Sequence, residues 1–183
     1  MKRHPLELLM PTRRTRILGA LIFAGGTVWI SWIMQRIVRG ISPGILAFEF
    51  AGTPANAARI IERWGVSGEA RMLAQIGLDN WFLFFYSTTI ALLCVMVAIR
   101  LRPHSSRWAD YGVLLAWLAW LAALLDRIEN YALVQIIEGS RSYLLTTAAF
   151  GCAALKFLIL SICLLYIVFS PIIFSRVRQK VST

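Results

Sequence analysis

The chain has 183 residues, of which 58% are hydrophobic and 15% are charged, and its mean hydropathy is +0.68. Soluble domains are closer to half apolar, so this composition excludes an ordinary soluble protein and favours a membrane protein. The formal net charge of +10 would indicate nucleic-acid binding in a soluble protein. Here the cations flank long apolar runs, so we expect membrane lipids as partners and no nucleic acid.

Four long apolar stretches are each able to cross a bilayer, for which about 20 mostly apolar residues are needed. They are Ile17–Met34, Trp81–Ile99, Tyr111–Ile137 and Leu144–Phe174. The first follows a basic segment, as in a signal peptide, but no small-residue cleavage pattern comes after it, so we expect a retained span. The sequence predicts an all-α, integral membrane four-helix bundle as a single domain over residues 17–174. Its spans are expected at about 17–37, 78–99, 110–137 and 144–170.

The distribution of Lys and Arg predicts the orientation of these spans. Eleven cations lie in the arm 1–16, in the loop after the second span and in the tail 175–183, against six in the other two loops. By the positive-inside rule, both termini are expected in the cytoplasm and the protein in the cell (inner) membrane. Because the arm contains Pro5 and Pro11, we expect it to be poorly ordered.

The outer loop, residues 38–76, contains a predicted amphipathic helix. Thr53 is a suitable N-cap, Pro54 suits the first helical position, and Gly65 is expected to end the helix. Its apolar face comprises Ala57, Ile60, Ile61 and Trp64. A second short helix is expected from Ser67. The first helix either lies flat on the bilayer surface or covers the outer ends of the bundle.

Several polar residues interrupt the apolar spans. Asp126, Glu129 and Asn130 share one helix face because they are three and four residues apart. Counting from the turn Glu138–Ser142 places Lys156 at nearly the same depth as Asp126, so we expect Lys156 to pair with Asp126 or Glu129. The remaining candidates are Asp79 and Asn80, which open the second span, and Glu49, which precedes it. Together they predict a polar pocket that opens outward.

A second interpretation places the same charges at the membrane interface. If the third span begins at Trp108, about 20 residues bring it to Arg127, and the carboxylates beyond are simply solvated. Lys156 would also be interfacial if the fourth span begins at Phe157, although Pro171 is expected to shorten that span. In this interpretation Asp79 is only a helix N-cap.

Four short motifs carry a resemblance. They are FEFAG at Phe48–Gly52, RWG at Arg63–Gly65, LDN at Leu78–Asn80 and LLDRIEN at Leu124–Asn130. In these motifs the chain resembles a group of small bacterial four-span membrane proteins whose activity is not known. The resemblance implies the fold and the choice of polar residues, but no reaction or ligand. Four helices with intramembrane carboxylates are also similar to the sterol-isomerase-like membrane fold, in which such residues face a lipid-binding cavity.

The cysteines and histidines predict neither a metal site nor a cofactor. Cys94, Cys152 and Cys163 all lie within spans and are best explained as small core residues. His4 and His104 have no partner at metal-ligand spacing.

Three functions follow as hypotheses. The leading one is a membrane protein that binds a lipid or other hydrophobic ligand in the polar pocket, and a lipid-modifying enzyme with Asp126 or Glu129 as acid or base is its catalytic variant. The second is an accessory or scaffolding subunit that meets another membrane protein or a second copy of itself. The third, ion movement through the carboxylates, would need an oligomer.

Overall fold

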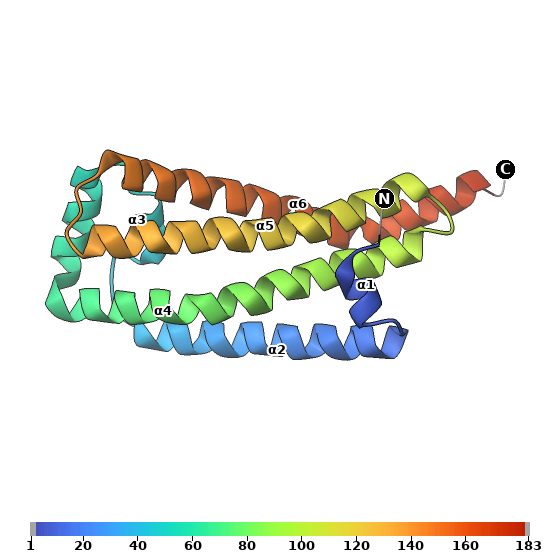
Figure 1. Ribbon diagram of the computed structural model, residues 1–183, viewed down its shortest axis with the longest axis horizontal. Helices are drawn as coiled ribbons and strands as arrows, with labels where there is room; N and C mark the ends of the chain where they lie inside the picture. The colour runs from blue at the N-terminus through green and yellow to red at the C-terminus, as the bar shows by residue number, and fades with distance from the viewer. Residues whose placement is uncertain (1–2, 182–183) are drawn as a thin grey trace. The chain divides into compact units, whose positions relative to one another are not determined.

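A computed structural model describes the backbone of residues 3–181 and the side chains of residues 3–176. Within these residues it contains only helices: α1 (Pro5–Leu9), α2 (Arg13–Ile37), α3 (Ile45–Glu49), α4 (Pro54–Leu101), α5 (Ser106–Ile137) and α6 (Tyr143–Val181) (Figure 1). The predicted all-α fold is therefore confirmed. Lys2 of the predicted arm and the side chains of Arg178 and Lys180 in the predicted tail lie outside the described residues.

Four of these helices are long and apolar enough to cross a membrane, in agreement with the four predicted spans. They are Arg13–Ile37, Pro54–Leu101, Ser106–Ile137 and Tyr143–Arg176. Length and apolar composition therefore identify a multi-pass membrane protein.

The first loop helix starts and ends as predicted, but the expectation of a second short loop helix separate from the second span is wrong. The amide of Asn56 donates to Thr53 Oγ1 at 3.3 Å, which is the predicted N-cap, and Gly65 interrupts the helix with φ 60° and ψ 176°. After Gly65, however, α4 continues without a break to Leu101. The predicted second loop helix and span two are one helix, because no proline or turn sequence separates them.

Pro171 does not end α6, which continues to Val181. A proline inside a helix removes one backbone donor and its ring crowds the preceding turn, but membrane helices tolerate both better than soluble ones do. The expected shortening of the fourth helix at this residue is wrong.

The N-terminal arm is also more ordered than expected. His4 and Glu7 form a reciprocal capping box for α1, and Arg102 donates two hydrogen bonds of 2.9 Å to the Glu7 carboxylate. The His4 ring is fully buried and lies 4.7 Å from each of the rings of Trp117 and Trp120. The prolines therefore start or flank α1 instead of disordering it, because Pro is favourable in the first turn of a helix.

The chain divides into two compact units, and α2, α4, α5 and α6 contribute to both. Unit 1 comprises Met1–Gly25, Phe85–Ala122 and Leu158–Thr183, and unit 2 comprises Gly26–Phe84 and Ala123–Phe157. In unit 1 the Tyr166 hydroxyl donates to the backbone oxygen of Trp108 at 2.9 Å, and Cys94 and Cys163 are fully buried free thiols. The single four-span domain stays a prediction.

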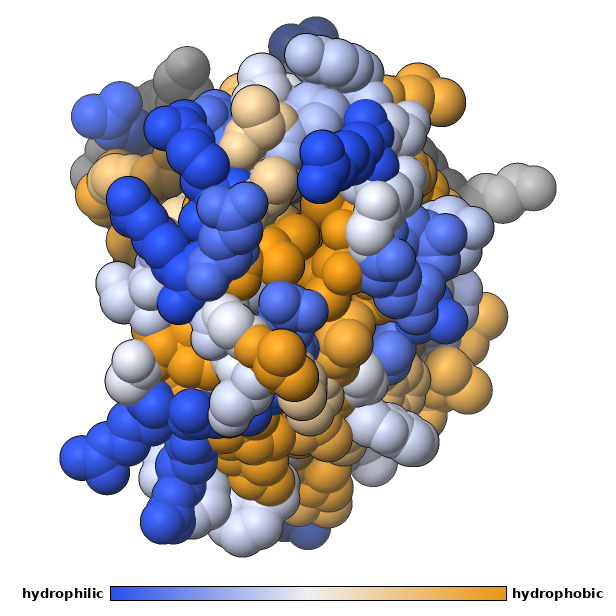
Figure 2. All heavy atoms as spheres, turned by 90° about the vertical axis from the view of Figure 1, so that its left-hand side faces the viewer, coloured by the Kyte–Doolittle hydropathy of each residue, from blue (hydrophilic) through white to orange (hydrophobic). Residues whose placement is uncertain are grey.

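In unit 2, the first segment of α4 packs against protein. Its Ala57 and Trp64 are buried in one core cluster with Phe48 of α3 and Ile136 of α5, and the Trp64 ring nitrogen donates to the Pro43 carbonyl at 2.6 Å. In Figure 1 this segment (teal) runs across the ends of α5 and α6. Figure 2 looks onto this side and shows apolar atoms in the centre with hydrophilic side chains around them. The contacts favour the covering arrangement over one flat on the bilayer.

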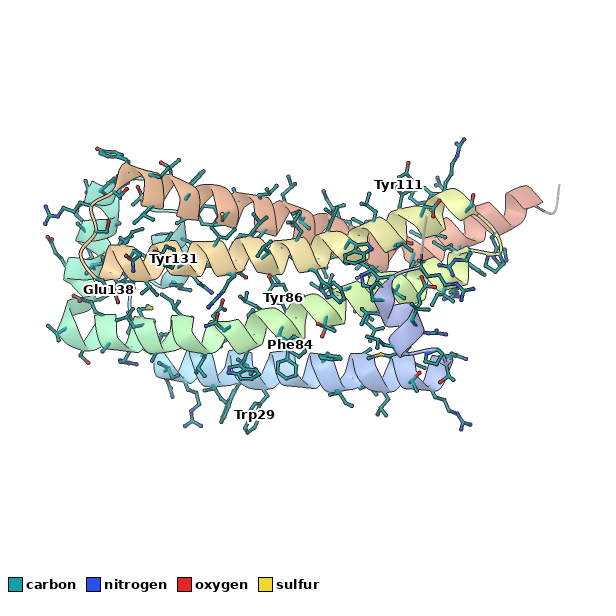
Figure 3. All side chains as sticks on the ribbon, in the orientation of Figure 1. Trp29, Phe84, Tyr86, Tyr111, Tyr131 and Glu138 are labelled. Atoms are coloured by element: carbon teal, nitrogen blue, oxygen red, sulfur yellow. The ribbon has the colours of Figure 1, made fainter. Side chains whose placement is uncertain are left out.

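The helix α2 leaves most of its apolar side chains exposed. They include Leu18, Leu21, Ile22, Val28, Trp29 and Trp32. Figure 3 shows Trp29 extending from the side of α2 that faces away from α4. An exposed apolar surface of this kind suits contact with lipid or with another membrane helix.

Candidate functional site

Lys156 of α6 is the centre of a buried ionic cluster in unit 2. Its ammonium nitrogen lies 2.6 Å from Asp126 Oδ1, 2.8 Å from Glu129 Oε2 and 3.6 Å from Glu49 Oε2. The Lys156 side chain is 6% exposed and the Glu129 side chain is 0% exposed. The ion pairs expected from the depth of Lys156 and Asp126 are therefore both present.

Local structure explains why these four side chains meet. Asp126 and Glu129 lie on one face of α5, one turn apart. The short turn at residues 138–142 returns the chain as α6, which brings Lys156 alongside them. Glu49 is the last residue of α3, and the burial of its neighbour Phe48 in the core holds α3 against this site.

The interfacial interpretation does not describe this arrangement. Asp126, Glu129 and Lys156 are all buried in protein, whereas solvated interfacial charges would be exposed. Nor is Asp79 a helix N-cap, because α4 begins at Pro54 and Asp79 lies well inside it. Among the described residues, no group of His, Cys, Asp and Glu side chains is arranged to hold a metal ion.

A second set of polar contacts joins α4 to α5. The Asn130 side-chain amide donates to Asp79 Oδ2 at 2.6 Å, and the Arg127 guanidinium donates to the Asn80 side-chain oxygen. Asn130 is buried with the ionic cluster, whereas Asn80 and Arg127 are exposed. All six predicted site residues thus make polar contacts in unit 2, but in two sets rather than around one cavity.

The hydrogen bonding of the ionic cluster is incomplete. Glu129 Oε2 is close enough to Lys156 for an ion pair but is not aligned for a hydrogen bond. Neither Glu129 Oε1 nor Glu49 Oε2 has a hydrogen-bond partner among the described residues. Burial raises the pKa of Glu49, and the charge of Asp126 adds to this rise, whereas Lys156 and a hydrogen-bonding contact with Glu129 oppose it.

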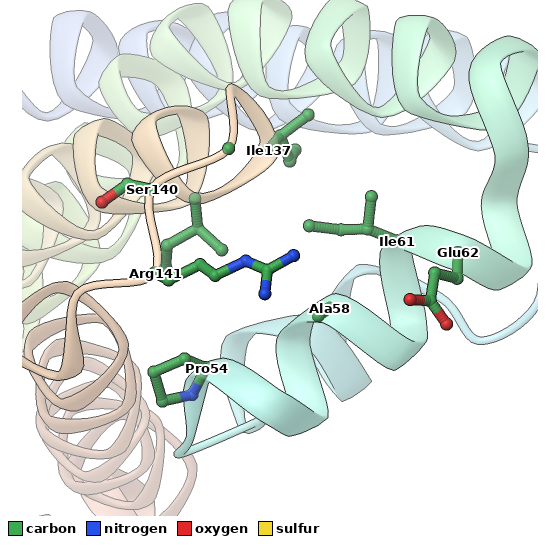
Figure 4. Close-up of a pocket in the computed structure, with 9 residues that line it drawn as sticks. Pro54, Ala58, Ile61, Glu62, Ile137, Ser140 and Arg141 are labelled. Carbon is green, nitrogen blue, oxygen red and sulfur yellow. The ribbon is translucent and has the colours of Figure 1, made fainter.

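A pocket of about 160 Å³ lies elsewhere in unit 2, between the first segment of α4 and the turn that joins α5 to α6 (Figure 4). Its walls are formed by Pro54, Ala58, Ile61, Glu62, Ile136, Ile137, Gly139, Ser140 and Arg141. Figure 4 shows the Arg141 guanidinium extending toward Ala58 and Ile61. None of the predicted polar residues lines this pocket. Arg141 was not among the predicted site residues, and its place in the tight turn Glu138–Ser142 is the sequence signal that could have indicated it.

Comparison of the chain with protein-family models, with curated proteins and with solved structures gives no match. The resemblance to small bacterial four-span membrane proteins therefore stays a prediction. What the helices establish is the class, a multi-pass membrane protein with an all-α fold.

Proposed function

We propose that this membrane protein binds an anionic amphiphile, such as a phospholipid or a fatty acid, in the pocket beside Arg141. The observation that carries the proposal is the composition of the pocket: Ile61, Ile136 and Ile137 provide apolar walls, and Arg141 provides a guanidinium that reaches over them. A lipid ligand was also predicted from the sequence, but at the polar residues around Asp126 and not at Arg141.

The chemistry of the walls favours an amphiphile over a fully apolar or a fully polar ligand. A guanidinium presents a fork of donors that matches a carboxylate or a phosphate. The isoleucines offer an apolar surface for the adjoining part of an acyl chain, and each buried methylene contributes about 0.8 kcal/mol. Glu62, on the opposite wall, disfavours a second negative charge in the ligand.

The size of the pocket limits how much of the ligand it holds. Sites for whole drug-sized ligands usually measure roughly 300–1,000 Å³, whereas this pocket measures about 160 Å³. The pocket therefore holds the headgroup and the start of a chain, and the rest of the chain lies along the exposed apolar surface of the helices.

The distribution of Lys and Arg supports cytoplasmic termini, and this orientation decides on which side of the membrane the pocket lies. With the termini inside, the turn at residues 138–142 and the start of α4 both face outward. The ligand then comes from the outer leaflet or from outside the cell membrane. Labelling of a cysteine placed at Ser140 by a membrane-impermeant maleimide on intact cells tests this orientation, and labelling only after lysis would contradict it.

Native mass spectrometry of the protein from nanodiscs tests the binding site. The discs contain phosphatidylcholine with a rising share of phosphatidylglycerol, and bound phosphatidylglycerol is counted for wild type, Arg141→Gln and Arg63→Gln. Arg63 is the matched control because it is an exposed arginine on the segment of α4 that forms one wall of the pocket, but it does not itself line the pocket. Loss of an exposed charged contact of about 1 kcal/mol predicts roughly fivefold weaker binding in Arg141→Gln only. Equal weakening in both variants would mean that only general surface charge is involved.

A role as an accessory subunit is the second candidate, and the exposed face of α2 favours it. Trp29 and Trp32 lie 62% and 50% exposed, and aromatic side chains are frequent at protein interfaces. Chemical crosslinking in native membranes followed by peptide mapping would attach a partner to α2 if this role holds. Asp126 and Glu129 are engaged by Lys156 and do not line the pocket, which argues against their acting on a ligand held there.

A further inference from the structure

We infer that Glu49 and Glu129 share one bound proton, which makes the cluster around Lys156 a proton-binding site. This inference concerns a different part of unit 2 from the amphiphile pocket and does not depend on it. Its ligand is the proton itself, held between a carboxylic acid and a carboxylate.

The charges of the cluster around Lys156 do not balance if every group is ionised. Three carboxylates, those of Glu49, Asp126 and Glu129, lie within 3.6 Å of a single ammonium group. If all were ionised, the cluster would carry a net charge of −2 in a site from which water is largely excluded. Burying unbalanced charge is so unfavourable that a buried group binds or releases a proton instead.

The cluster also contains hydrogen-bond acceptors that lack a donor among the described residues. Glu129 Oε1 and Glu49 Oε2 are buried oxygens with no hydrogen-bond partner among the described residues. An ionised carboxylate has no hydrogen to offer, so two ionised carboxylates cannot satisfy each other. One proton on either group turns it into a donor to the other, in keeping with the hydrogen-bonding contact between the two side chains.

The contacts of the neighbouring groups indicate which carboxylate holds the proton. The groups that face Glu49 and Glu129 are Asp126 on α5, Lys156 and Cys152 on α6, and Asp79 on α4. Asp126 receives the shortest contact from Lys156, and Asp79 receives a hydrogen bond from Asn130. Glu49 lies farthest from the ammonium of the three carboxylates, at 3.6 Å. Its anion is therefore the least stabilised by Lys156, in agreement with its raised pKa.

The proton has a structural consequence for α3. Glu49 sits between Phe48, which packs on Trp64, and Phe50, which packs on Phe150 and Phe157. Loss of the proton would leave a negative carboxylate on α3 next to the negative carboxylates of Glu129 and Asp126 around one ammonium group. Because the pKa of Glu49 is higher in the folded protein than in the unfolded chain, its effect favours the fold at low pH. That advantage is lost as the pH rises through the folded-state pKa.

Infrared difference spectroscopy of the protein in detergent tests the inference. The stretching band of a protonated carboxylic acid is distinct from that of a carboxylate, and it is followed at neutral pH and on titration to alkaline pH. The variants are Glu49→Gln, Glu129→Gln, Asp79→Asn and the exposed control Glu138→Gln. The amides of glutamine and asparagine have nearly the size of the protonated acids and can donate a hydrogen bond, so we expect these variants to retain the fold.

We expect a protonated carboxyl band in wild type that is lost in both Glu49→Gln and Glu129→Gln and kept in the other two variants. A wild-type spectrum without such a band, or one whose band disappears only in Asp79→Asn, would overturn the inference. Thermal unfolding in detergent gives an independent readout. The wild-type midpoint should fall with rising pH, and this fall should be smaller in Glu49→Gln; an unchanged pH profile in that variant would also count against a shared proton.

Discussion

Replacing Lys156 by methionine removes the cation that lies among the buried carboxylates of Glu49, Asp126 and Glu129. Methionine has a similar length and no charge, so the substitution keeps the packing and leaves Asp126 and Glu129 without their partner. Breaking a buried ion pair by removing one member costs about 3–5 kcal/mol, because an uncompensated charge stays buried. Most single domains are stable by only about 5–15 kcal/mol, so this loss should be easy to measure.

The loss should depend on pH, because the orphaned carboxylates can bind protons. Protonation of an unpaired carboxylate costs less free energy at low pH. The free energy of unfolding of Lys156→Met should therefore be closer to that of wild type at acidic than at alkaline pH. Adding Asp126→Asn to Lys156→Met should recover part of the stability, since one of the unpaired charges is then removed.

Reversible unfolding in mixed micelles of mild detergent and dodecyl sulfate, followed by circular dichroism, supplies the free energies. Arg176→Met is the control because Arg176 is an exposed cation on the same helix, and its free energy of unfolding should stay within about 0.5 kcal/mol of wild type. If Lys156→Met also stayed within that range at alkaline pH, the carboxylates would have to be hydrated, and the reasoning from burial would be refuted.

Three further substitutions test other parts of the structure. Glu7→Gln should weaken the docking of α1, and faster hydrogen exchange in α1 would show this, whereas unchanged exchange would contradict it. Burial alone would raise the pKa of Glu7, but Arg102 and the hydrogen bond from His4 hold this pKa below its ordinary value of 4.5. The stabilisation by Glu7 is therefore complete above pH 4.5 and is lost as the pH falls further. Gly112→Ala should lower the free energy of unfolding in micelles by about 1–3 kcal/mol, because the added methyl would contact the Tyr166 hydroxyl and lie 2.8 Å from Ala98 Cβ. Gly151→Ala is the control, because its added methyl meets nothing within 4 Å and should not destabilise the protein. Gly65→Ala should lower the free energy of unfolding by about 1–3 kcal/mol, because φ 60° with ψ 176° is accessible almost only to glycine. The control is Gly77→Ala, at a helical glycine with nothing within 4 Å of the added methyl. Equal stability of the two variants would show that the break at Gly65 is dispensable.

Much of the architecture follows from local sequence alone. Four apolar runs of sufficient length determine four membrane helices, because an unsatisfied backbone is intolerable in lipid. Thr53 and Pro54 determine a helix start, Gly65 determines a break, and the spacing of Asp126 and Glu129 determines a shared face. Counting residues from the turn was enough to predict the pairing of Lys156, because two helices joined by a short turn must run antiparallel.

Other features depend on contacts between segments that are distant in sequence, and local sequence patterns do not predict them. Whether Asp126, Glu129 and Lys156 were buried or interfacial depended on what surrounds α5 and α6, and Glu49 and Phe48 of α3 complete that surrounding. The order of the N-terminal arm depended on Arg102, 95 residues from Glu7. The pocket at Arg141 exists because the start of α4 folds across the α5–α6 turn. Local patterns report which residues share a helix face, but the neighbours of that face are set by the packing of the whole chain.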